Sequence, residues 1–302
     1  MAKDRLTIGV VCSRGIGPER GGRARNEDNY LVCRDGEARY RNQDREAVEA
    51  MATFGSLICV ADGMGGHEDG DLASSAAVRA MARLFKRGVP EDPELHLHRF
   101  VLDAHRRLHR KVSERGPVRM GTTLTSLWML EGQAFWTHVG DSRLYHWRKG
   151  NLRRITQDHT RANFAVRDGR RPDSDGAFLA QNFVYGSRGF GNDEGIRMDA
   201  GTDTGVVELE VGDRLMLCSD GLSGIVPDHR IGDVLAEVPE PQPAATALME
   251  RALAAGSDDN VTVIVARVDE LFPRQVAKME DDPFGFEDLD QSVDDDTLVP
   301  MD

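Results

Sequence analysis

The sequence predicts an α+β protein in which antiparallel sheets are packed between helices. Three observations support this fold class: strand-like apolar segments lie near both ends of the chain, two hairpin patterns lie in its middle, and the helical segments come in adjacent pairs. A parallel sheet would need strands and helices that alternate along the chain, and this sequence lacks that alternation. We therefore expect a layered sandwich of sheets with helices on the outside.

The N-terminal part of the chain supplies three of the predicted strands. Residues 6–12 and 29–34 have strand-like patterns, and residues 54–61 end in an apolar run typical of a buried strand. Residues 13–22 are rich in glycine and are predicted to form a loop between the first two strands. The polar stretch 35–46 is also predicted to be a loop.

Two predicted helices follow these strands. Residues 71–86 have an amphipathic pattern, because apolar side chains recur at every fourth position from Leu72 to Leu84. The second helix is predicted to begin at Asp92-Pro93, since proline is favoured in the first helical turn. It is predicted to run to about residue 115.

The middle of the chain contains two predicted antiparallel hairpins. The first joins residues 122–130 to 133–139 through a Glu-Gly turn, and the second joins 142–147 to 151–156 through a Lys-Gly turn. Residues 157–203 are rich in Gly, Arg and Asp and show little periodicity. A stretch of this length without clear elements is usually a functional loop, so we expect a flap there.

The C-terminal third resumes regular elements and then becomes acidic. Residues 270–302 contain 11 acidic and two basic residues, so they carry −9 of the net charge of −13. We expect residues 1–269 to form one domain and residues 270–302 to be a disordered acidic tail. The charge of −4 that remains for the domain disfavours a nucleic-acid-binding surface. The elements predicted before the tail are strands at 206–210, 214–219 and 261–268 and helices at 231–238 and 244–255.

The sequence carries no signal for a membrane or for secretion. No segment approaches the roughly 20 consecutive apolar residues of a membrane-spanning helix, and the N-terminus lacks the apolar core of a signal peptide. We therefore expect a cytoplasmic protein without a membrane partner. The cysteines agree with this expectation, because each lies in or beside an apolar run and none form a CxxC pair. They are Cys12, Cys33, Cys59 and Cys218.

Acidic residues recur where predicted strands begin or end. The clearest is Asp62, which follows the apolar run 57–61 and precedes a glycine-rich turn. At this segment alone, an aspartate that caps the next helix explains the pattern as well as a metal ligand does. The other acidic points are Glu27-Asp28, Asp141, Asp220 and Asp258-Asp259. Five such points that converged could not all stay ionised without cations, so the sequence predicts a site with two or more metal ions.

Six short motifs around these acidic points occur in a fixed order. They are Arg23-x-x-Asn26-Glu27-Asp28, Asp62-Gly63-Met64-Gly65-Gly66, Gly121-Thr122-Thr123, Gly140-Asp141-Ser142-Arg143, Ser219-Asp220-Gly221-Leu222 and Asp259-Asn260-Val261-Thr262. Together they span about residues 6–268 and resemble the metal-dependent protein phosphatase (PPM, or type 2C) family, above all its bacterial branch. The resemblance implies that family's four-layer α-β-β-α sandwich, with two central antiparallel sheets and a metal site at one edge between them.

The resemblance also implies a role for each matching residue of the metal site. Asp62 would bridge both metal ions, and the carbonyl of Gly63 would bind the second ion. Asp220 and Asp259 would complete the shell of the first ion. Glu27 would act through a water molecule. The ligands are all oxygen atoms, which suit Mg²⁺ or Mn²⁺ better than zinc.

Three further roles have competing explanations. Asp28 would support the site from behind the ligands, although a bond to the backbone of its own turn also explains an aspartate there. Arg23 would bind the substrate phosphate with its guanidinium fork, and Arg25 is its rival. Asp141 would bind a weaker third metal ion, unless it is a hairpin-turn residue. Gly224 stands where some family members have a further aspartate, which weakens the case for the third ion.

The function implied by the resemblance is the removal of phosphate from phosphoserine and phosphothreonine in proteins, in opposition to a bacterial Ser/Thr kinase. Two metal ions lower the pKa of a bridging water and offset charge on the transferred group. We therefore expect direct in-line attack by that water, without a phosphoenzyme. Two rival functions are a catalytically silent binding module on the same fold and a metal-dependent hydrolase of another phosphoester.

The acidic tail carries a separate hypothesis about partners. Thr297 follows three aspartates, Asp294 to Asp296, and precedes the apolar Leu298. This pattern suits a kinase site or a docking peptide for a phosphothreonine-reading domain. A solubilising disordered tail explains the same composition more simply.

Overall fold

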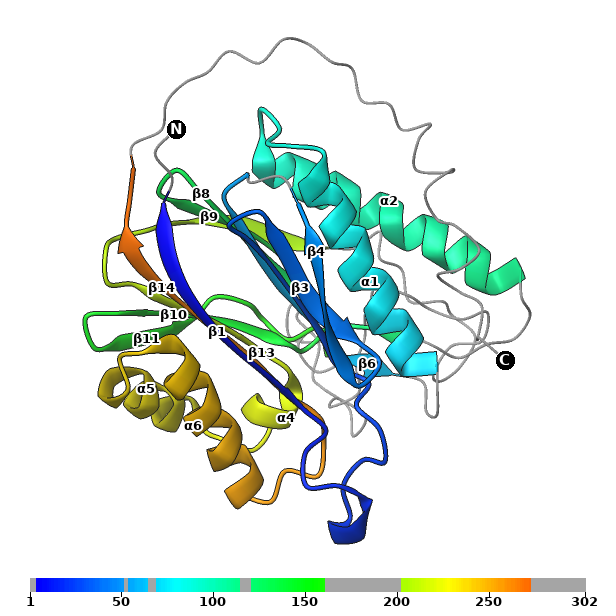
Figure 1. The fold of residues 1–302 in the computed structure, drawn as a ribbon, viewed down its shortest axis with the longest axis vertical. Helices are drawn as coiled ribbons and strands as arrows, with labels where there is room; N and C mark the ends of the chain where they lie inside the picture. Colours follow the sequence, from blue (N-terminus) through cyan, green and yellow to red (C-terminus); the bar gives the residue numbers. More distant parts are fainter. Residues whose placement is uncertain (1–3, 52–53, 65–68, 115–120, 161–201, 273–302) are drawn as a thin grey trace, which may run out of the picture.

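The computed structural model shows the layered α+β sandwich that the sequence predicts (Figure 1). Most of the predicted flap at 157–203 and nearly all of the acidic tail at 270–302, including Thr297, lie outside the described residues. The ranges that the structure describes are 4–51, 54–64, 69–114, 121–160 and 202–272.

The larger sheet contains seven strands in the order β12-β9-β8-β5-β2-β3-β4, and each neighbouring pair is antiparallel. The predicted Glu-Gly turn joins β8 to β9, and the φ angles are 50° at Glu131 and 81° at Gly132. Positive φ angles at both turn positions match the twist of a two-residue hairpin. The strands are β12 (Asp203–Glu208), β9 (Gln133–Val139), β8 (Leu124–Leu130), β5 (Ser56–Ala61), β2 (Asn29–Arg34), β3 (Glu37–Asn42) and β4 (Arg45–Ala50).

The smaller sheet brings the two ends of the described chain together. Its order is β1-β14-β13-β10-β11, again with antiparallel pairs throughout. The second predicted hairpin, β10–β11, belongs to this sheet and not to the sheet that holds the first hairpin. The strands are β1 (Arg5–Ser13), β14 (Val261–Glu270), β13 (Arg214–Cys218), β10 (Arg143–Arg148) and β11 (Asn151–Arg154). A short separate ladder joins β6 (Gly63–Met64) to β7 (Gly121–Thr122).

Helices cover the outer face of each sheet, which completes the four layers (Figure 1). Helix α1 packs on β2 and β5, and α2 packs on β9 and β12. On the other side, α6 packs on β1 and β14 and is joined by α5. Within the described ranges, no helix has the length and apolar character needed to cross a membrane. The helices are α1 (Asp69–Lys86), α2 (Pro93–Glu114), α4 (Asp220–Ser223), α5 (Asp228–Glu237) and α6 (Pro241–Ala254), with a 3₁₀ turn at Pro18–Arg20.

Three layers of buried apolar side chains fill the spaces between the four layers of sheets and helices. Strand β5 shows the principle, because its side chains alternate between two of them. Leu57 and Cys59 face the α1–α2 layer, whereas Ile58 and Val60 face the smaller sheet. The third layer lies between the smaller sheet and helices α5 and α6. A strand buried on both faces reads as a continuous apolar run, as the sequence of β5 does.

The predicted loop at residues 35–46 is wrong, because most of this stretch belongs to the β3–β4 hairpin at the edge of the larger sheet. Asp35 and Gly36 form a tight turn with φ angles of 53° and 85°. Ala38 and Tyr40 are buried, while β4 is largely exposed and charged. Charged side chains protect an edge strand from pairing with other chains, and they also hide it from an analysis based on apolar pattern.

Three smaller differences occur in the C-terminal third. A short helix, α4, follows β13 and was not predicted. Helix α6 begins at Pro241, three residues before the predicted start, because proline is well tolerated in a first helical turn. The last strand runs to Glu270, and the N–H of Phe272 donates a hydrogen bond to Asp4 Oδ1 at 2.8 Å. The last described residues thus contact the first ones, just after the end of the final strand.

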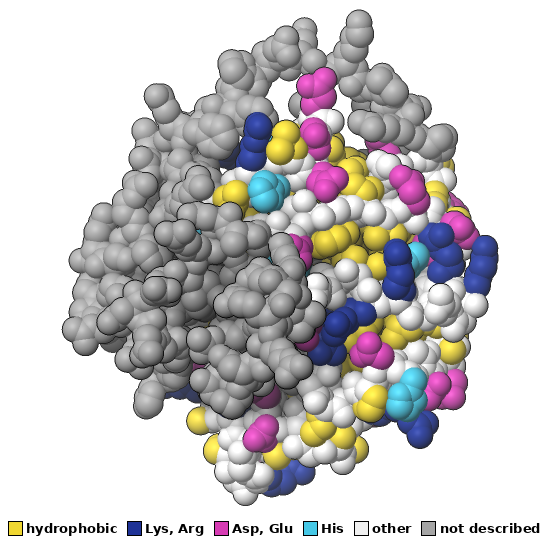
Figure 2. All heavy atoms as spheres, turned by 180° about the vertical axis from the view of Figure 1, so that it is seen from behind, with side chains coloured by type: hydrophobic (Ala, Val, Ile, Leu, Met, Phe, Trp, Pro, Cys, Tyr) yellow, Lys and Arg dark blue, Asp and Glu magenta, His cyan; other side chains and the backbone are white. Residues whose placement is uncertain are grey.

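The surface carries charges of both signs. Figure 2 shows Lys and Arg side chains interspersed with Asp and Glu side chains and with apolar groups on one face of the described residues. The described residues on this face form no continuous basic area, in agreement with the low net charge of the domain.

Candidate metal centre

The strand ends that carry the predicted acidic residues meet at one edge of the two sheets. In the larger sheet, the first residue of β2 pairs with the last residue of β5, so Asp28 and Asp62 leave the sheet side by side. In the smaller sheet, the end of β13 pairs with the start of β14, which brings Asp220 and Asp259 together. Asp141 lies on the loop from β9 to β10, which connects the two sheets.

The carboxylates of this cluster repel one another. Burial raises the pKa of Asp62 well above its usual range, and nearby negative charges raise it further. The pKa of Asp220 is also raised, first by burial and then by the charge of Asp259, although its contact with Asp62 acts in the opposite direction. The charges that act on Asp62 are those of Asp28, Asp220, Asp141 and Asp259.

Asp28 is buried beneath the cluster, with 1% of its surface exposed. Its Oδ2 accepts hydrogen bonds from Ser219 Oγ at 2.8 Å and from Thr262 Oγ1 at 2.7 Å. Burial raises the pKa of Asp28 to about 7, although the two hydroxyl groups act in the opposite direction. These bonds join the loop before β2 to the strand ends that carry Asp220 and Asp259.

Arg23 makes a two-pronged ion pair with Asp259. Its Nε lies 2.9 Å from Oδ1 and its Nη2 lies 2.7 Å from Oδ2. The hydrogen bond to Asp259 raises the pKa of Arg23, and the nearby charges of Glu27 and Asp62 add to this effect. The side chain of Arg23 is 57% exposed. The structure therefore places the predicted phosphate-binding guanidinium among three of the predicted metal-site carboxylates.

Asp141 lies at the point where the chain crosses between the sheets. The preceding Gly140 has a φ of 110°, which glycine adopts readily and other residues do not. Burial raises the pKa of Asp141 to about 7, and the charges of Asp220 and Asp158 act in the same direction. Because β9 and β10 belong to different sheets, Asp141 is not a hairpin-turn residue.

Gly63 lies where backbone segments approach one another closely. A Cβ atom at this position would lie 2.2 Å from the carbonyl oxygen of Gly70 and 2.5 Å from that of Glu27. A Cβ atom on Gly70 would lie 2.8 Å from the carboxyl carbon of Glu27. Glycine at both positions lets the start of α1 pack directly on the segment that carries Glu27.

The donor set fits divalent cations that prefer oxygen ligands, since carboxylates of Asp and Glu dominate it. Among the residues that the structure describes, no three acidic, His or Cys side chains already surround one metal position. In the structure, both carboxylate oxygens of Asp259 contact the guanidinium of Arg23. A cation bound at this carboxylate would replace that ion pair.

A family profile described as Protein phosphatase 2C matches residues 37–260, which is more than half of the chain. The chain belongs to this family. The matched range includes Asp62, Asp141, Asp220 and Asp259, whereas Arg23 lies before it. The resemblance drawn from six short motifs is thereby confirmed, and so is the fold class that it implied.

Bacterial members of the 2C family support the assignment. Serine/threonine phosphatase stp of Listeria welshimeri is 31% identical over 235 residues, which cover 76% of this chain and 91% of that protein. Protein phosphatase PhpP of Streptococcus pneumoniae is 31% identical over 246 residues, covering 80% and 97%. A crystal structure of the catalytic domain of the Ser/Thr protein phosphatase PstP in complex with two manganese ions is 32% identical. Its TM-score is 0.66, and the match covers 88% of this chain and 99% of that one.

Two residues beneath this 2C-family site were not predicted from the sequence. Arg41 on β3 and Asp71 on α1 contact each other and lie against the Glu27–Asp28 segment. The prediction of a loop at 35–46 hid Arg41. The alternation of Ala38 and Tyr40 within that stretch is the signal that identifies the strand.

A pair of buried histidines beside Asp141 was also missed. His159 Nδ1 accepts a hydrogen bond from Gly140 N–H at 3.2 Å, and its Nε2 lies 3.2 Å from Asp203 Oδ2. His138 stacks against His159 with ring centroids 4.6 Å apart. Burial lowers the pKa of His138 to about 3, so it is neutral at physiological pH. These residues lie far apart in the sequence, and no spacing pattern reveals that they meet.

Proposed function

We propose that this Ser/Thr protein phosphatase of the 2C family hydrolyses phosphoserine and phosphothreonine in proteins at the carboxylate cluster, with two Mg²⁺ or Mn²⁺ ions as cofactors. The observation that carries the proposal is the convergence of Asp62, Asp220 and Asp259 from separate strand ends. Burying acids so close together costs stability unless cations bind. The two manganese ions in the structure of the relative PstP support the choice of cofactor.

The proposed ligand roles follow the positions of the residues. Asp62 and the carbonyl of Gly63 would hold the two ions together with Asp220 and Asp259, with Asp62 shared between the ions. Glu27, whose charge acts on Arg23 beside the cluster, contributes through an intervening water. The interaction of Asp62 with each of the other aspartates supports its central place.

Two further residues complete the proposed site. Asp28 supports it from below through its bonds to the hydroxyl groups of Ser219 and Thr262. Asp141 would hold a weaker third ion, and desolvation together with the negative charge of Asp220 raises the pKa of its carboxyl group. Gly224 follows the short helix α4 and offers no carboxylate to that ion.

The bound cations supply an activated water for in-line attack on phosphorus and offset charge on the phosphoryl oxygens. Arg23 orients the phosphate, because its Nε and Nη2 groups form a fork that matches two oxygen atoms. The same two groups bind Asp259 in the structure, which shows that they can hold a planar pair of oxygens at this place.

The cysteines do not provide a nucleophile for a phosphoenzyme. Burial raises the pKa of the Cys12 thiol to about 11 and that of Cys218 to about 12. Thiols with such pKa values stay protonated at neutral pH and react poorly. A phosphocysteine intermediate is therefore disfavoured, and direct attack by water remains the proposed step.

The proposal extends to the substrate proteins, the partners and the location of the protein. The names of the relatives support phosphoproteins of a bacterial Ser/Thr kinase pathway as substrates. The four unpaired cysteines agree with a cytoplasmic location. We keep the docking of the acidic tail around Thr297 to a phosphothreonine-reading domain as a hypothesis. Unchanged partner capture after deletion of residues 280–302 would reject it.

The test of the proposed function is phosphate release from a phosphothreonine peptide in the presence of EDTA, Mg²⁺ or Mn²⁺. We expect metal-dependent release, and we expect Asp220→Ala to lower it by more than the roughly 100-fold that loss of an outer partner of a metal ligand causes. Asp233→Asn is the matched control, because Asp233 is exposed on α5 and pairs with Arg230 at 3.4 Å.

The same assay separates the rival functions. Activity that survives EDTA or Asp220→Ala would contradict the role of the carboxylate cluster. Faster hydrolysis of nucleotides or sugar phosphates than of phosphopeptides would favour a hydrolase of another phosphoester. No hydrolysis of any of these substrates would favour a binding module on the same fold.

A further inference from the structure

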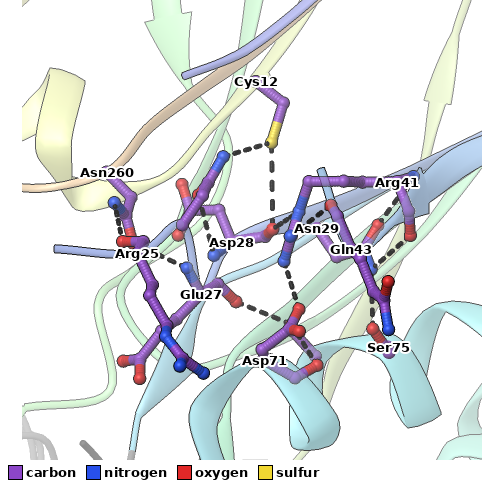
Figure 3. Close-up of polar contacts among 12 residues, drawn as sticks. Cys12, Arg25, Glu27, Asp28, Asn29, Arg41, Gln43, Asp71, Ser75 and Asn260 are labelled. Atoms are coloured by element: carbon purple, nitrogen blue, oxygen red, sulfur yellow. Dashed lines mark hydrogen bonds and ion pairs between the residues drawn. The ribbon is translucent and has the colours of Figure 1, made fainter. Parts of the chain in front are cut away.

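We propose that Arg41 and Asp71 form a positioning pair that holds the Glu27–Asp28 dipeptide in place at the proposed metal site. The inference rests on the proposed function, because it assigns the pair a part in cation binding. Arg41 lies on β3 with 7% of its surface exposed, and Asp71 lies in the first turn of α1. The Nη2 group of Arg41 donates a hydrogen bond to Oδ1 of Asp71 (Figure 3).

All four backbone polar groups of the Glu27–Asp28 dipeptide bond to side chains. The N–H of Glu27 donates to Asn260 Oδ1 at 2.8 Å, and its carbonyl accepts from Ser74 Oγ at 2.6 Å. The N–H of Asp28 donates to Asn26 Oδ1 at 3.2 Å, and its carbonyl accepts from Arg41 Nε at 2.6 Å. Arg41 is the charged donor among these four partners, and charge-assisted hydrogen bonds are the stronger kind.

Arg41 is itself fixed by contacts on three sides. Its Nη1 donates to the carbonyl of Gln43 at 2.7 Å. Its backbone N–H donates to Asn29 Oδ1 at 3.1 Å, and its carbonyl accepts from Asn29 Nδ2 at 3.0 Å. Asn29 Nδ2 also donates to Ser75 Oγ on α1 at 3.0 Å (Figure 3). A guanidinium held at all three nitrogen atoms cannot rotate away, so β3 and α1 together set the position of the Asp28 carbonyl.

Asp71 connects this network to the other predicted ligands. It lies next to Gly70, whose carbonyl oxygen packs so closely on Gly63 that a Cβ there would be 2.2 Å away. Ser74, which bonds the dipeptide, also donates to the carbonyl of Asp71 at 3.1 Å. The Arg41–Asp71 pair therefore holds the first turn of α1, the dipeptide and Gly63 in one arrangement.

Loss of the Arg41 guanidinium would leave the Asp28 carbonyl without its charged donor. The remaining neighbour is Cys12 Sγ at 3.8 Å, a weak donor at long distance. A lysine at position 41 would keep a charge for Asp71 but would lack the fork that reaches three partners. Because outer partners of metal ligands typically change metal affinity roughly 10- to 100-fold, the effect should appear in cation binding.

The test measures Mn²⁺ binding by isothermal titration calorimetry and thermal unfolding for the full chain and four variants. Arg41→Ala and Asp71→Asn should weaken Mn²⁺ binding by roughly 10-fold or more, and Arg41→Lys should restore part of it. Arg39→Ala is the matched control, because Arg39 lies two residues earlier on β3, is 51% exposed and pairs with Glu37 at 2.8 Å. An exposed pair of this kind contributes little, so Mn²⁺ affinity should stay within about twofold.

The outcomes separate a positioning role from a merely structural one. If Arg41→Ala lowers the unfolding temperature but binds Mn²⁺ as Arg39→Ala does, the proposal is overturned. If Arg41→Ala does not fold, Asp71→Asn decides by the same titration, since it keeps the size and an acceptor oxygen of the side chain. A wild-type protein that binds no Mn²⁺ would overturn the proposed function as well. Wild-type binding with unchanged affinity in the variants would overturn this inference alone.

Discussion

Under the proposed function, the guanidinium of Arg23 and a metal ion would compete for the same carboxylate, Asp259. In the structure, both prongs of the guanidinium fork bind Asp259. The proposed function assigns Asp259 to the first ion and Arg23 to the substrate phosphate, so both contacts exchange when cation and substrate bind. The exchange conserves charge pairing, because a cation replaces the guanidinium at Asp259 and a phosphate replaces the carboxylate at Arg23.

Arg23→Lys should raise the KM for a phosphothreonine peptide by roughly 10-fold, the loss expected for one charge-assisted hydrogen bond. The physical reason is that an ammonium group cannot match two phosphate oxygens as a fork does. The affinity for Mn²⁺ should not fall, because lysine competes less well for Asp259. Steady-state kinetics at saturating Mn²⁺ and a Mn²⁺ titration measure the two effects.

Arg25→Lys is the control for this substitution, because Arg25 is the sequence rival for the phosphate. A larger rise in KM for Arg25→Lys than for Arg23→Lys would assign phosphate binding to Arg25. A fall in Mn²⁺ affinity for Arg23→Lys would contradict the competition between the guanidinium and the cation.

The first turn of α1 is the element whose packing most directly positions the proposed ligands. Its Gly70 lies against both Gly63 and Glu27 at distances that leave no room for side-chain atoms. Ser74, in the second turn of α1, donates a hydrogen bond to the carbonyl of Glu27. The close approach of three backbone segments therefore depends on glycine, and a single added methyl group should separate them.

Gly63→Ala should destabilise the protein by about 1–3 kcal/mol, the usual cost of overpacking, and should weaken Mn²⁺ binding. Gly232→Ala is the matched control, because Gly232 lies in α5 and its Cβ would meet Leu152 atoms at ordinary distances of 3.6 and 3.8 Å. Alanine there should stabilise the protein by about 0.5–1 kcal/mol, since glycine is unfavourable within a helix. Urea unfolding measures both, and equal effects of the two substitutions would rule out the packing argument.

The proposed site joins the two sheets across the edge of the sandwich. Asp28 and Asp62 come from the larger sheet, and Asp220 and Asp259 come from the smaller one. Any ligand that binds these residues together binds the folded state and not the unfolded chain, so it stabilises the fold by mass action. Cation binding and global stability are therefore linked in this architecture.

At pH 8, Mn²⁺ at 100 times its dissociation constant should raise the free energy of unfolding by about 2.7 kcal/mol, and the same Mn²⁺ concentration should give a smaller gain at pH 5.5. The raised pKa values of Asp28 and Asp141, both about 7, mean that the metal-free fold holds protons that the unfolded chain loses near pH 4. Stability without metal should therefore fall as the pH rises from about 4 to above 7.

Chemical denaturation with Mn²⁺ or EDTA at the two pH values measures this difference. Asp220→Ala should abolish most of the gain, because it removes a proposed ligand. Equal stabilisation of the wild type at pH 5.5 and pH 8 would contradict the link between deprotonation of these carboxyl groups and cation binding.

The sequence predicted most strands and helices within a few residues, because each strand or helix that packs on a core shows its period in the apolar residues. The main exception is the β3–β4 hairpin. The β3–β4 hairpin lies at a sheet edge and is held by ladder hydrogen bonds around a charged surface, so its pattern is weak. Arg41 was missed with it, and its burial is visible only when β3 is placed beside Asp28 and Asp71.

The candidate ligands were predicted from sequence because acidic residues recur at the ends of several predicted strands, and six ordered motifs identified the family. Tertiary structure was needed for everything that depends on distance. It showed that Arg23 binds Asp259, that the charges of Asp62 and Asp220 act on each other, and that Arg41 donates to the Asp28 carbonyl. The sequence shows which residues stand at the ends of strands. Electrostatic repulsion and hydrogen bonding act over only a few ångströms, between segments that only folding brings together.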